Sequence, residues 1–389
     1  MTFDGSQADR LAREAVQQRW DGVSRPARHT DFVLVGAALV LAGFGLMMIH
    51  SATSYRLEVA GQNELQYVIR QAIALAIGMV GMVAVSLFDY RVYRAWAPLL
   101  YGATLLMLVY VLFGGSVING SQAWIQLAGF QFQPSELAKV SLILMLAALF
   151  HERREEALGL RALVEALGVA AAPMVLVLLQ PDFGTFMVYV AIVCGVLLLA
   201  RVRVRYMVAL TAIGLAAIIA VLLSGALAEY QVKRLTAFVN PGEASPESIY
   251  NVKQAQIAVG SGQFTGRGLG NGSQTALSFV PENQTDFIFT VVGEELGFVG
   301  SSVMLAIFAL ILLRGLRIAA ASQDTFGTLI AGGVVSVLAF QLFINVGMTI
   351  GLMPVTGLTL PFVSYGGTSL ISSFLMIGLL QNVHIRRFS

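Results

Sequence analysis

Charge is the property that this sequence has least of. Asp, Glu, Lys and Arg make up 12% of its 389 residues, whereas hydrophobic residues make up 57%. Soluble domains carry about 25% charged residues, so a chain this apolar has too little polar surface to cover a globule in water. The bilayer must therefore be the solvent for most of it. The net charge of +2 is also too small to suggest nucleic acid as a partner.

Cysteine and histidine are scarce as well. The single cysteine, Cys194, cannot form an intramolecular disulfide, and no CxxC metal pattern exists. It lies in an apolar run, where we expect a small core residue. The four histidines (His29, His50, His151 and His384) are widely scattered, which argues against a zinc site built from histidine. The sequence has no P-loop and no motif of a Ser-His-Asp hydrolase, so none of these common signatures names a reaction.

Apolar runs close to the length of a bilayer span recur along the chain and predict about ten transmembrane helices. The predicted spans are 32–49, about 68–87, 96–113, 134–150, two between 163 and 200, about 206–223, 287–313, 326–350 and 362–381. The fifth and sixth are separated at Gln180-Pro181-Asp182, because a proline between polar residues fits a tight turn better than a mid-membrane helix. The predicted fold class is an all-α polytopic membrane protein.

The positions of the basic residues predict the orientation of these spans. If the N-terminus is inside the cell, 17 of the 24 Lys and Arg residues fall in cytoplasmic segments, as the positive-inside rule requires. These are Arg10, Arg13, Arg19, Arg25, Arg28, Arg91, Arg94, Arg153, Arg154, Arg161, Arg201, Arg203, Arg205, Arg314, Arg317, Arg386 and Arg387. We expect both termini in the cytoplasm. Residues 1–30 would form a cytoplasmic tail without the apolar core of a signal peptide, and 31–389 the transmembrane domain.

Two segments on the predicted exterior are long enough to carry function. One is 114–133, and the other is a large loop at 224–286 that is rich in Gly, Ser, Asn, Gln and charge. Apolar residues of the large loop, among them Ile257, Phe264 and Phe279, predict that it is ordered and partly buried in the membrane. No internal repeat is visible, which weakens an interpretation as an inverted-repeat transporter.

A first polar constellation opens the predicted fourth span, in Gln133-Pro134-Ser135-Glu136-Leu137-Ala138-Lys139. Proline suits the first turn of a helix, and the carboxylate of Glu136 complements the helix dipole there. Lys139 lies three residues further on, on the same face. The two charges either neutralise each other as a structural pair or line a water-filled cavity in which the ammonium binds an anion. We favour the cavity, because a purely structural site could simply be apolar.

A second constellation lies directly before the predicted eighth span, where Glu282 and Asp286 are four residues apart. Thr285 or Asp286 could cap the helix that starts at residue 287, but capping leaves Glu282 unexplained. Glu294 and Glu295 lie farther inside the same span, and at least one of them should face protein or water and not lipid.

A third constellation, 354–367, combines paired prolines and glycines. It is either a plain loop leading into the last span or a broken segment, and broken backbone is tolerated at membrane depth only against protein or a cavity.

In these three segments the chain resembles the SEDS family, the shape, elongation, division and sporulation proteins of bacteria. The resemblance extends to 180–185, to 256–270 (QIAVGSGQFTGRGLG) and to 293–297, and it covers nearly all of 32–387 in order. At 353–357 (MPVTG) and 238–241 (FVNP) the chain is more similar to the elongation branch of the family than to the division branch.

This resemblance implies a peptidoglycan glycosyltransferase of the bacterial cytoplasmic membrane. Such an enzyme polymerises lipid II into glycan strands outside the membrane, releases undecaprenyl pyrophosphate, and works with a class B penicillin-binding protein of the elongation machinery. Asp286 matches the essential acidic residue of the family's TDF block, and we expect it to be the catalytic base. Expected substrate-binding residues are Trp124, Glu136, Lys139, Arg234 and Glu282.

The expected roles differ among these residues. Lys139 and Arg234 would offset charge on the departing diphosphate, and Trp124 would offer an aromatic face to sugar or lipid. Glu282 would orient Asp286 or help to hold a divalent cation, Mg²⁺ or Mn²⁺; no cofactor is certain.

The sequence departs from the family at two positions. It has Gln284 where many members have histidine, and Ala123 where many have arginine. The first change removes a proton shuttle, and the second leaves Lys139 and Arg234 as the main cations for a diphosphate.

Two other functions fit the same architecture. One is a lipid II flippase, and the other is a non-catalytic scaffold for the penicillin-binding protein. A transporter needs polar groups that can be reached from both faces of the membrane, whereas Trp124, Arg234, Glu282 and Asp286 all fall on the predicted exterior side. Sidedness therefore favours the enzyme.

Overall fold

The structure is a computed structural model in which residues 29–118, 120–127, 130–152, 159–224, 246–277 and 279–387 are described. Its helices are α2 (Phe32–Val59), α3 (Gln66–Leu87), α4 (Tyr90–Gly114), α5 (Pro134–His151), α6 (Leu160–Leu179), α7 (Phe183–Leu199), α8 (Val204–Ser224), α10 (Pro246–Ser261), α11 (Ser273–Ala276), α12 (Ile288–Ala320), α13 (Thr325–Thr349) and α14 (Gly367–Arg386). Most of the predicted tail, Arg234 and the stretch 238–241 lie outside the described residues.

The ten predicted spans coincide with α2 to α8 and α12 to α14. Eight of these helices are long and apolar enough to cross a membrane, and α7 and the described part of α8 are shorter apolar helices. The fold class is therefore a polytopic α-helical membrane protein. Several helices run past their apolar stretch, α2 by ten residues to Val59, because hydropathy marks the bilayer and not the end of the helix.

Local sequence explains where several helices begin. Asp31 caps α2, and its carboxylate accepts hydrogen bonds from the backbone N–H groups of Val33 and Leu34. Asp182 caps α7 in the same way. Pro134 occupies the first turn of α5, where its missing N–H costs nothing.

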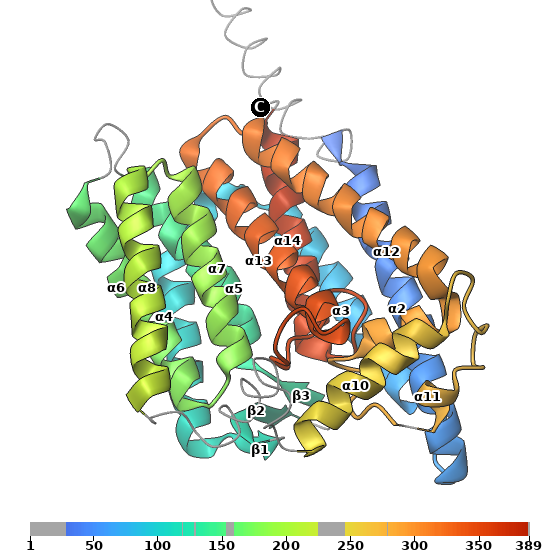
Figure 1. Cartoon of the computed structure of the whole chain (residues 1–389). Coiled ribbons are helices and arrows are strands. Elements are labelled where there is room, and N and C mark those ends of the chain that lie inside the picture. Colours follow the sequence, from blue (N-terminus) through green and yellow to red (C-terminus); the bar gives the residue numbers. More distant parts are fainter. Residues whose placement is uncertain are drawn as a thin grey trace, which may run out of the picture.

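The helices form one bundle whose two ends differ (Figure 1). The strands, α10 and α11 gather at one end, here called the sheet end, and α14 finishes at the opposite end. Helices α5, α13 and α14 are the inner ones. In their most apolar stretches, 78%, 67% and 83% of the residues are buried inside the protein, whereas in α3 and α4 only 22% are. Polar side chains on these inner helices therefore face protein and not lipid.

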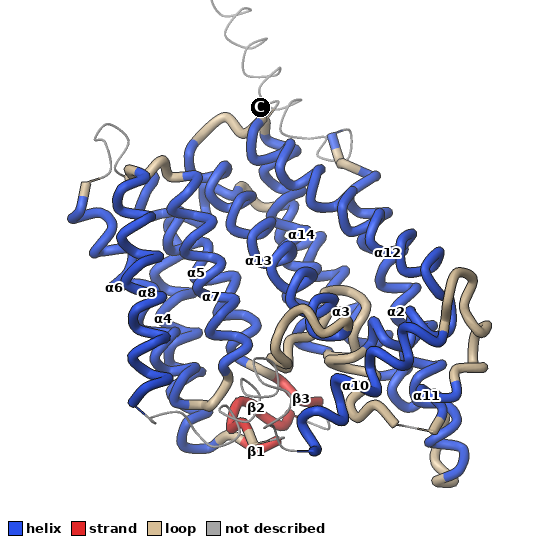
Figure 2. Tube along the Cα trace, viewed as in Figure 1, coloured by secondary structure: helices blue, strands red, loops and turns tan. Residues whose placement is uncertain are grey.

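A small antiparallel sheet is an addition that the all-α prediction did not contain. Strands β1 (Ser116–Ile118), β2 (Ser121–Leu127) and β3 (Phe130–Phe132) pair in the order β1-β2-β3 within the segment between α4 and α5. Figure 2 shows them in red at the sheet end. β2 packs on α4 and α5, and β3 packs on α14, so the sheet covers the sheet end of two inner helices.

One prediction about burial was wrong. Cys194 is exposed on α7 and is not a core residue; on a membrane helix an apolar run continues onto the surface that faces lipid. In the large loop, Ile257, Phe264 and Phe279 lie on the protein surface, and their burial in the membrane stays a prediction. Ala255 of the same loop is buried, because a short side chain lets α10 lie close against α12 and α13.

Helix α12 is interrupted at Gly297, whose φ of +63° and ψ of −157° are not helical. The backbone of the large loop satisfies the groups that this break exposes. Arg267 N–H donates to the Glu294 carbonyl at 3.0 Å, and Phe298 N–H donates to the Gln263 carbonyl at 2.9 Å. A break within an apolar helix is tolerable because another part of the chain replaces the lost helical bonds.

Candidate active site

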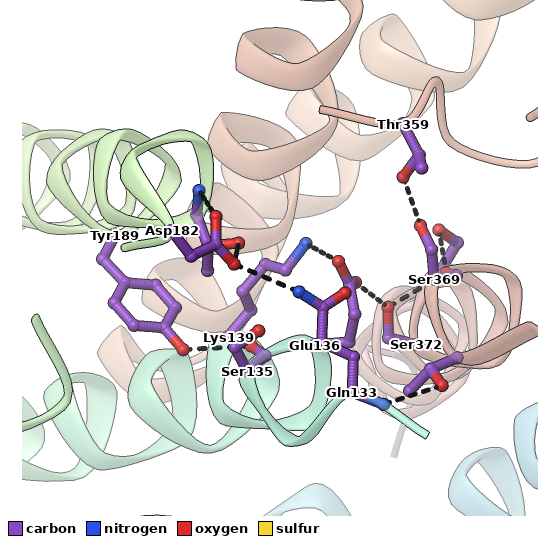
Figure 3. A network of polar contacts seen from close by, with 12 residues as sticks. Gln133, Ser135, Glu136, Lys139, Asp182, Tyr189, Thr359, Ser369 and Ser372 are labelled. Carbon is purple, nitrogen blue, oxygen red and sulfur yellow. Dashed lines mark hydrogen bonds and ion pairs between the residues drawn. The ribbon is translucent and has the colours of Figure 1, made fainter. Parts of the chain in front are cut away.

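The polar pair predicted at the start of α5 is present and deeply buried. Lys139 Nζ donates to Glu136 Oε1 at 2.7 Å, and the two side chains are 0% and 7% exposed. Figure 3 shows the pair among other polar side chains, with the ammonium turned toward the carboxylate. The structure thus contains the ion pair that was one of the two alternatives; a role in binding an anion remains a prediction.

A series of polar contacts through Ser372 and Ser369 leads away from this pair (Figure 3). Ser372 Oγ on α14 donates to Glu136 Oε2 at 2.9 Å and also lies 3.0 Å from the Ser369 carbonyl. The Ser369 hydroxyl lies 2.9 Å from Thr359 Oγ1. The pair on α5 is therefore linked through α14 to the third constellation.

Asp182 is a half-buried acid that the sequence predicts only as part of a turn. Its carboxylate accepts hydrogen bonds from Thr185 N at 3.0 Å, Thr185 Oγ1 at 2.7 Å and Gln133 Nε2 at 3.1 Å. Burial raises the pKa of the Asp182 carboxyl, while the bonds from Thr185 and the nearby charge of Lys139 lower it in part. The sequence signal that could have identified it is an acidic residue in the tight turn between two predicted spans.

Glu282 is an exposed residue on a strained turn. Its φ of +53° lies in the left-handed region, which is uncommon for a residue other than glycine. Thr285 Oγ1 and Gln284 Nε2 approach its Oε2 to 3.1 and 3.4 Å. Strain of this kind persists only where the surroundings fix it, and it gathers at functional sites.

Asp286 lies directly before the N-cap of α12. The N-cap position itself is taken by Phe287, whose side chain makes no cap bond, so neither Thr285 nor Asp286 occupies the position predicted for a cap. A methyl group placed on Gly357 would lie 3.5 Å from Asp286 Oδ2, which puts this carboxylate against the third constellation.

The segment 354–366 is the hub of the site. Its Tyr365 N–H donates to the Gln284 carbonyl at 2.8 Å, so it contacts the Asp286 turn. A methyl group on Gly184 would lie 2.6 Å from the Thr356 carbonyl, so it also contacts the start of α7 beside Asp182. Of the two alternatives, this is the broken segment packed against protein, and three separate acid-bearing regions contact it or are linked to it.

Glu294 and Glu295 both face protein, as predicted, and are 0% and 1% exposed. Glu294 accepts hydrogen bonds from the N–H groups of Gln274 and Thr275 at 2.8 and 2.9 Å. The hydroxyl of Ser51 on α2 donates to Glu295 at 2.7 Å. These carboxylates anchor the loop around α11 to the outer helices.

The remaining predicted site features are placed less completely. Trp124 is half-buried on β2, and its carbonyl accepts a hydrogen bond from Ser116 Oγ at 3.2 Å. Arg234 lies outside the described residues. Among the residues that are described, no group of three or more His, Cys, Asp or Glu side chains could hold a metal ion.

Residues 25–388 match the FtsW/RodA/SpoVE family of cell cycle proteins. The chain belongs to this family. Its members are the SEDS proteins, so the resemblance seen in the sequence is confirmed along nearly the whole chain.

Relatives with names of known function span almost the entire chain. Stage V sporulation protein E of Bacillus subtilis is 38% identical over 356 residues, covering 91% of this chain and 96% of that protein. The peptidoglycan glycosyltransferase MrdB of Escherichia coli is 36% identical over 368 residues, covering 95% of each. A probable peptidoglycan glycosyltransferase FtsW of Geobacter is 36% identical over 362 residues, covering 92% and 97%.

Solved structures agree with this assignment. One is a chain of a peptidoglycan synthase complex that coordinates polymerization and crosslinking, with a TM-score of 0.77 and 31% identity, covering 92% of this SEDS chain and 99% of that chain. The rod shape determining protein RodA of Thermus thermophilus gives a TM-score of 0.67 with 29% identity, covering 92% and 98%.

Proposed function

We propose that this SEDS protein is a peptidoglycan glycosyltransferase that polymerises lipid II and releases undecaprenyl pyrophosphate. The observation that carries the proposal is the convergence of Asp286, Asp182 and the Glu136–Lys139 pair on one broken segment at the sheet end of the bundle. Names of family relatives support the reaction class. A lipid-linked substrate would keep its tail in the bilayer while its head group reached this end.

In the proposed reaction the acceptor 4-hydroxyl oxygen attacks the anomeric carbon of the donor sugar. The bond from that carbon to the phosphate oxygen breaks, and the diphosphate leaves with the electron pair. Asp286 takes the hydroxyl proton; a positioned base contributes typically about 10²–10⁴-fold to a rate. Attack opposite the leaving group inverts the anomeric centre.

Three other residues would support this chemistry. Lys139 would stabilise negative charge on the departing diphosphate, with Glu136 holding it in place. That role requires the closed ion pair to open or rearrange when substrate binds, because the ammonium is fully buried. Trp124 would offer an aromatic face to sugar or lipid, and Arg234 would add a second cation.

The sheet end would face the outside of the cell, with both termini in the cytoplasm. The basic residues support this orientation by the positive-inside rule. A class B penicillin-binding protein would be the partner that crosslinks the strands, which the likeness to a synthase complex supports. A role in cell elongation is the finer proposal; the RodA structure and MrdB favour it, while the FtsW and sporulation relatives have similar identities.

A divalent cation would fit beside Glu282 and Asp286 only with help from the substrate. Two carboxylates are a common protein contribution to a magnesium site that is completed by phosphate and water. Both residues can therefore act as ligands, and the cation would supply positive charge to the diphosphate when bound.

The test is polymerisation of labelled lipid II by the purified protein, with and without its penicillin-binding partner. Moenomycin is added to silence the unrelated glycosyltransferases. Asp286→Asn should insert and fold like the wild type but make no polymer. Polymer made by this variant at a near wild-type rate would exclude Asp286 as the base, and a wild type that moves lipid II across vesicles without polymerising it would indicate a flippase.

A further inference from the structure

Asn345 lies on the inner helix α13, one turn before its end, and is fully buried. Its amide nitrogen donates two hydrogen bonds to two different segments. One goes to the carbonyl of Asp286 at 2.8 Å, and the other goes to the carbonyl of Leu358 at 2.7 Å. A single rigid side chain therefore joins the turn that carries Asp286 to the hub segment 354–366.

The carbonyl of Asp286 is open to this contact because the first turn of α12 is tight. The Thr290 N–H donates to the Phe287 carbonyl at 2.9 Å. A regular α-helical bond would have connected Thr290 to the Asp286 carbonyl instead. The partner of that carbonyl comes from α13.

The two preceding carbonyls are held as well. The Tyr365 N–H donates to the Gln284 carbonyl at 2.8 Å, and Ser364 Oγ donates to the Thr285 carbonyl at 2.6 Å. Three consecutive peptide groups are thus fixed from outside the turn, the last of them by Asn345. Such a clamp fixes the backbone from which the Asp286 side chain projects.

We propose that Asn345 is a positioning residue for the proposed base Asp286. The inference rests on the proposed function, since it concerns how accurately that carboxylate is aimed at the acceptor hydroxyl. Catalytic groups must be held to within about 0.5 Å, and a misplacement of about 1 Å can cost roughly 10²-fold in rate. Asn345 touches no substrate in this account and acts only through the Asp286 backbone.

Burial alone does not explain an asparagine at this position. Within the described residues its Oδ1 has no hydrogen-bond partner, and an unpaired polar atom in the interior is unfavourable. A leucine has nearly the same shape and would avoid that cost, at the loss of both donated bonds. The two bonds are therefore what the side chain contributes.

The experiment compares Asn345→Leu with Thr349→Val in the full-length protein. Thr349 lies four residues further along α13, is fully buried, and its hydroxyl donates to the Val346 carbonyl of its own helix. Asn345→Leu removes two buried hydrogen bonds and Thr349→Val removes one, but only the first substitution loosens the Asp286 turn. Lipid II polymerisation is measured against substrate concentration on monodisperse protein, and the unfolding temperature is measured in the same detergent.

The expected result is that Asn345→Leu lowers kcat by about 10²-fold while KM stays within about twofold, and that Thr349→Val keeps the wild-type kcat. A folded Asn345→Leu protein with wild-type kcat would overturn the proposal, whatever its unfolding temperature. If Asn345→Leu does not fold, the second variant is Ser364→Ala, which frees the Thr285 carbonyl next to Asp286. It should lower kcat without raising KM. Wild-type kcat in that variant would also overturn the proposal. A wild-type protein that makes no polymer would instead refute the proposed function.

Discussion

The buried pair of Glu136 and Lys139 offers a prediction that separates its two alternative roles. Lys139→Met leaves Glu136 as an ionised carboxylate in the interior, with the Ser372 hydroxyl as its remaining contact described above. Removing one partner of a buried pair costs roughly 3–5 kcal/mol, because the other charge stays buried without compensation. The side chains are 0% and 7% exposed, so solvent screens little of this cost.

The double variant Glu136→Gln/Lys139→Met should recover most of that stability. Replacing a whole buried pair by neutral groups of similar shape is often close to neutral. The assay is unfolding of the detergent-solubilised protein in a double-mutant cycle. The control is the ion pair of Arg161 and Glu165 on α6, which are 3.1 Å apart and whose arginine is 89% exposed. Arg161→Met should change stability little.

Polymerisation then decides the functional role. If Lys139 also stabilises the leaving diphosphate, the stable double variant should be about 10²–10³-fold slower than the wild type, as when an electrostatic donor is removed elsewhere. A double variant with wild-type stability and rate would leave the pair as a structural feature. A single Lys139→Met variant as stable as the wild type would refute the reasoning from burial itself.

Two further predictions concern the hub and the acid beside it. Gly357 has a φ of +76°, so Gly357→Ala should cost about 1–2 kcal/mol. It should also slow polymerisation, because the strained backbone lies within van der Waals reach of the Asp286 carboxylate. Gly61→Ala, with a φ of +66° and nothing within 4 Å, should cost the same stability without loss of activity. Because burial raises the pKa of Asp182, the native state favours its protonated form, and that contribution is lost as the pH rises through the folded pKa. The unfolding temperature of Asp182→Asn relative to the wild type should therefore increase as the pH is raised from about 4; a difference that does not change with pH would contradict the shift.

The architecture followed from the sequence because a bilayer imposes one simple rule. Each span must be apolar over the length that crosses the bilayer, and this property alone predicts α2 to α8 and α12 to α14. Hydropathy could not give the sheet at 116–132, where strands of three to seven residues carry too little periodic signal. It also could not tell lipid from protein, which is why Cys194 was placed in the core.

The candidate site followed only in part. Unusual charge at membrane depth marked Glu136, Lys139, Glu294 and Glu295 as residues that should face protein or water and not lipid, and all four are buried in protein. Pairing partners from distant helices could not be predicted. Asn345 in particular is a neutral residue in an apolar helix, and only the fold shows that it contacts a carbonyl 59 residues earlier in the chain.

The hub segment shows why irregular backbone can exist between the acids of this site. Within a bilayer, every peptide group must find a partner in the protein. Gln71 supplies two, since its Nε2 donates to the Ser364 carbonyl at 2.9 Å and its Oε1 accepts from Gly366 N–H at 3.1 Å. Asn345 supplies a third at Leu358. Side chains of α3 and of the inner helix α13 thus replace the bonds that a continuous helix would form, and in doing so they hold the backbone beside Asp286 in one shape. The features that make the break tolerable in a membrane are the same ones that position the proposed base.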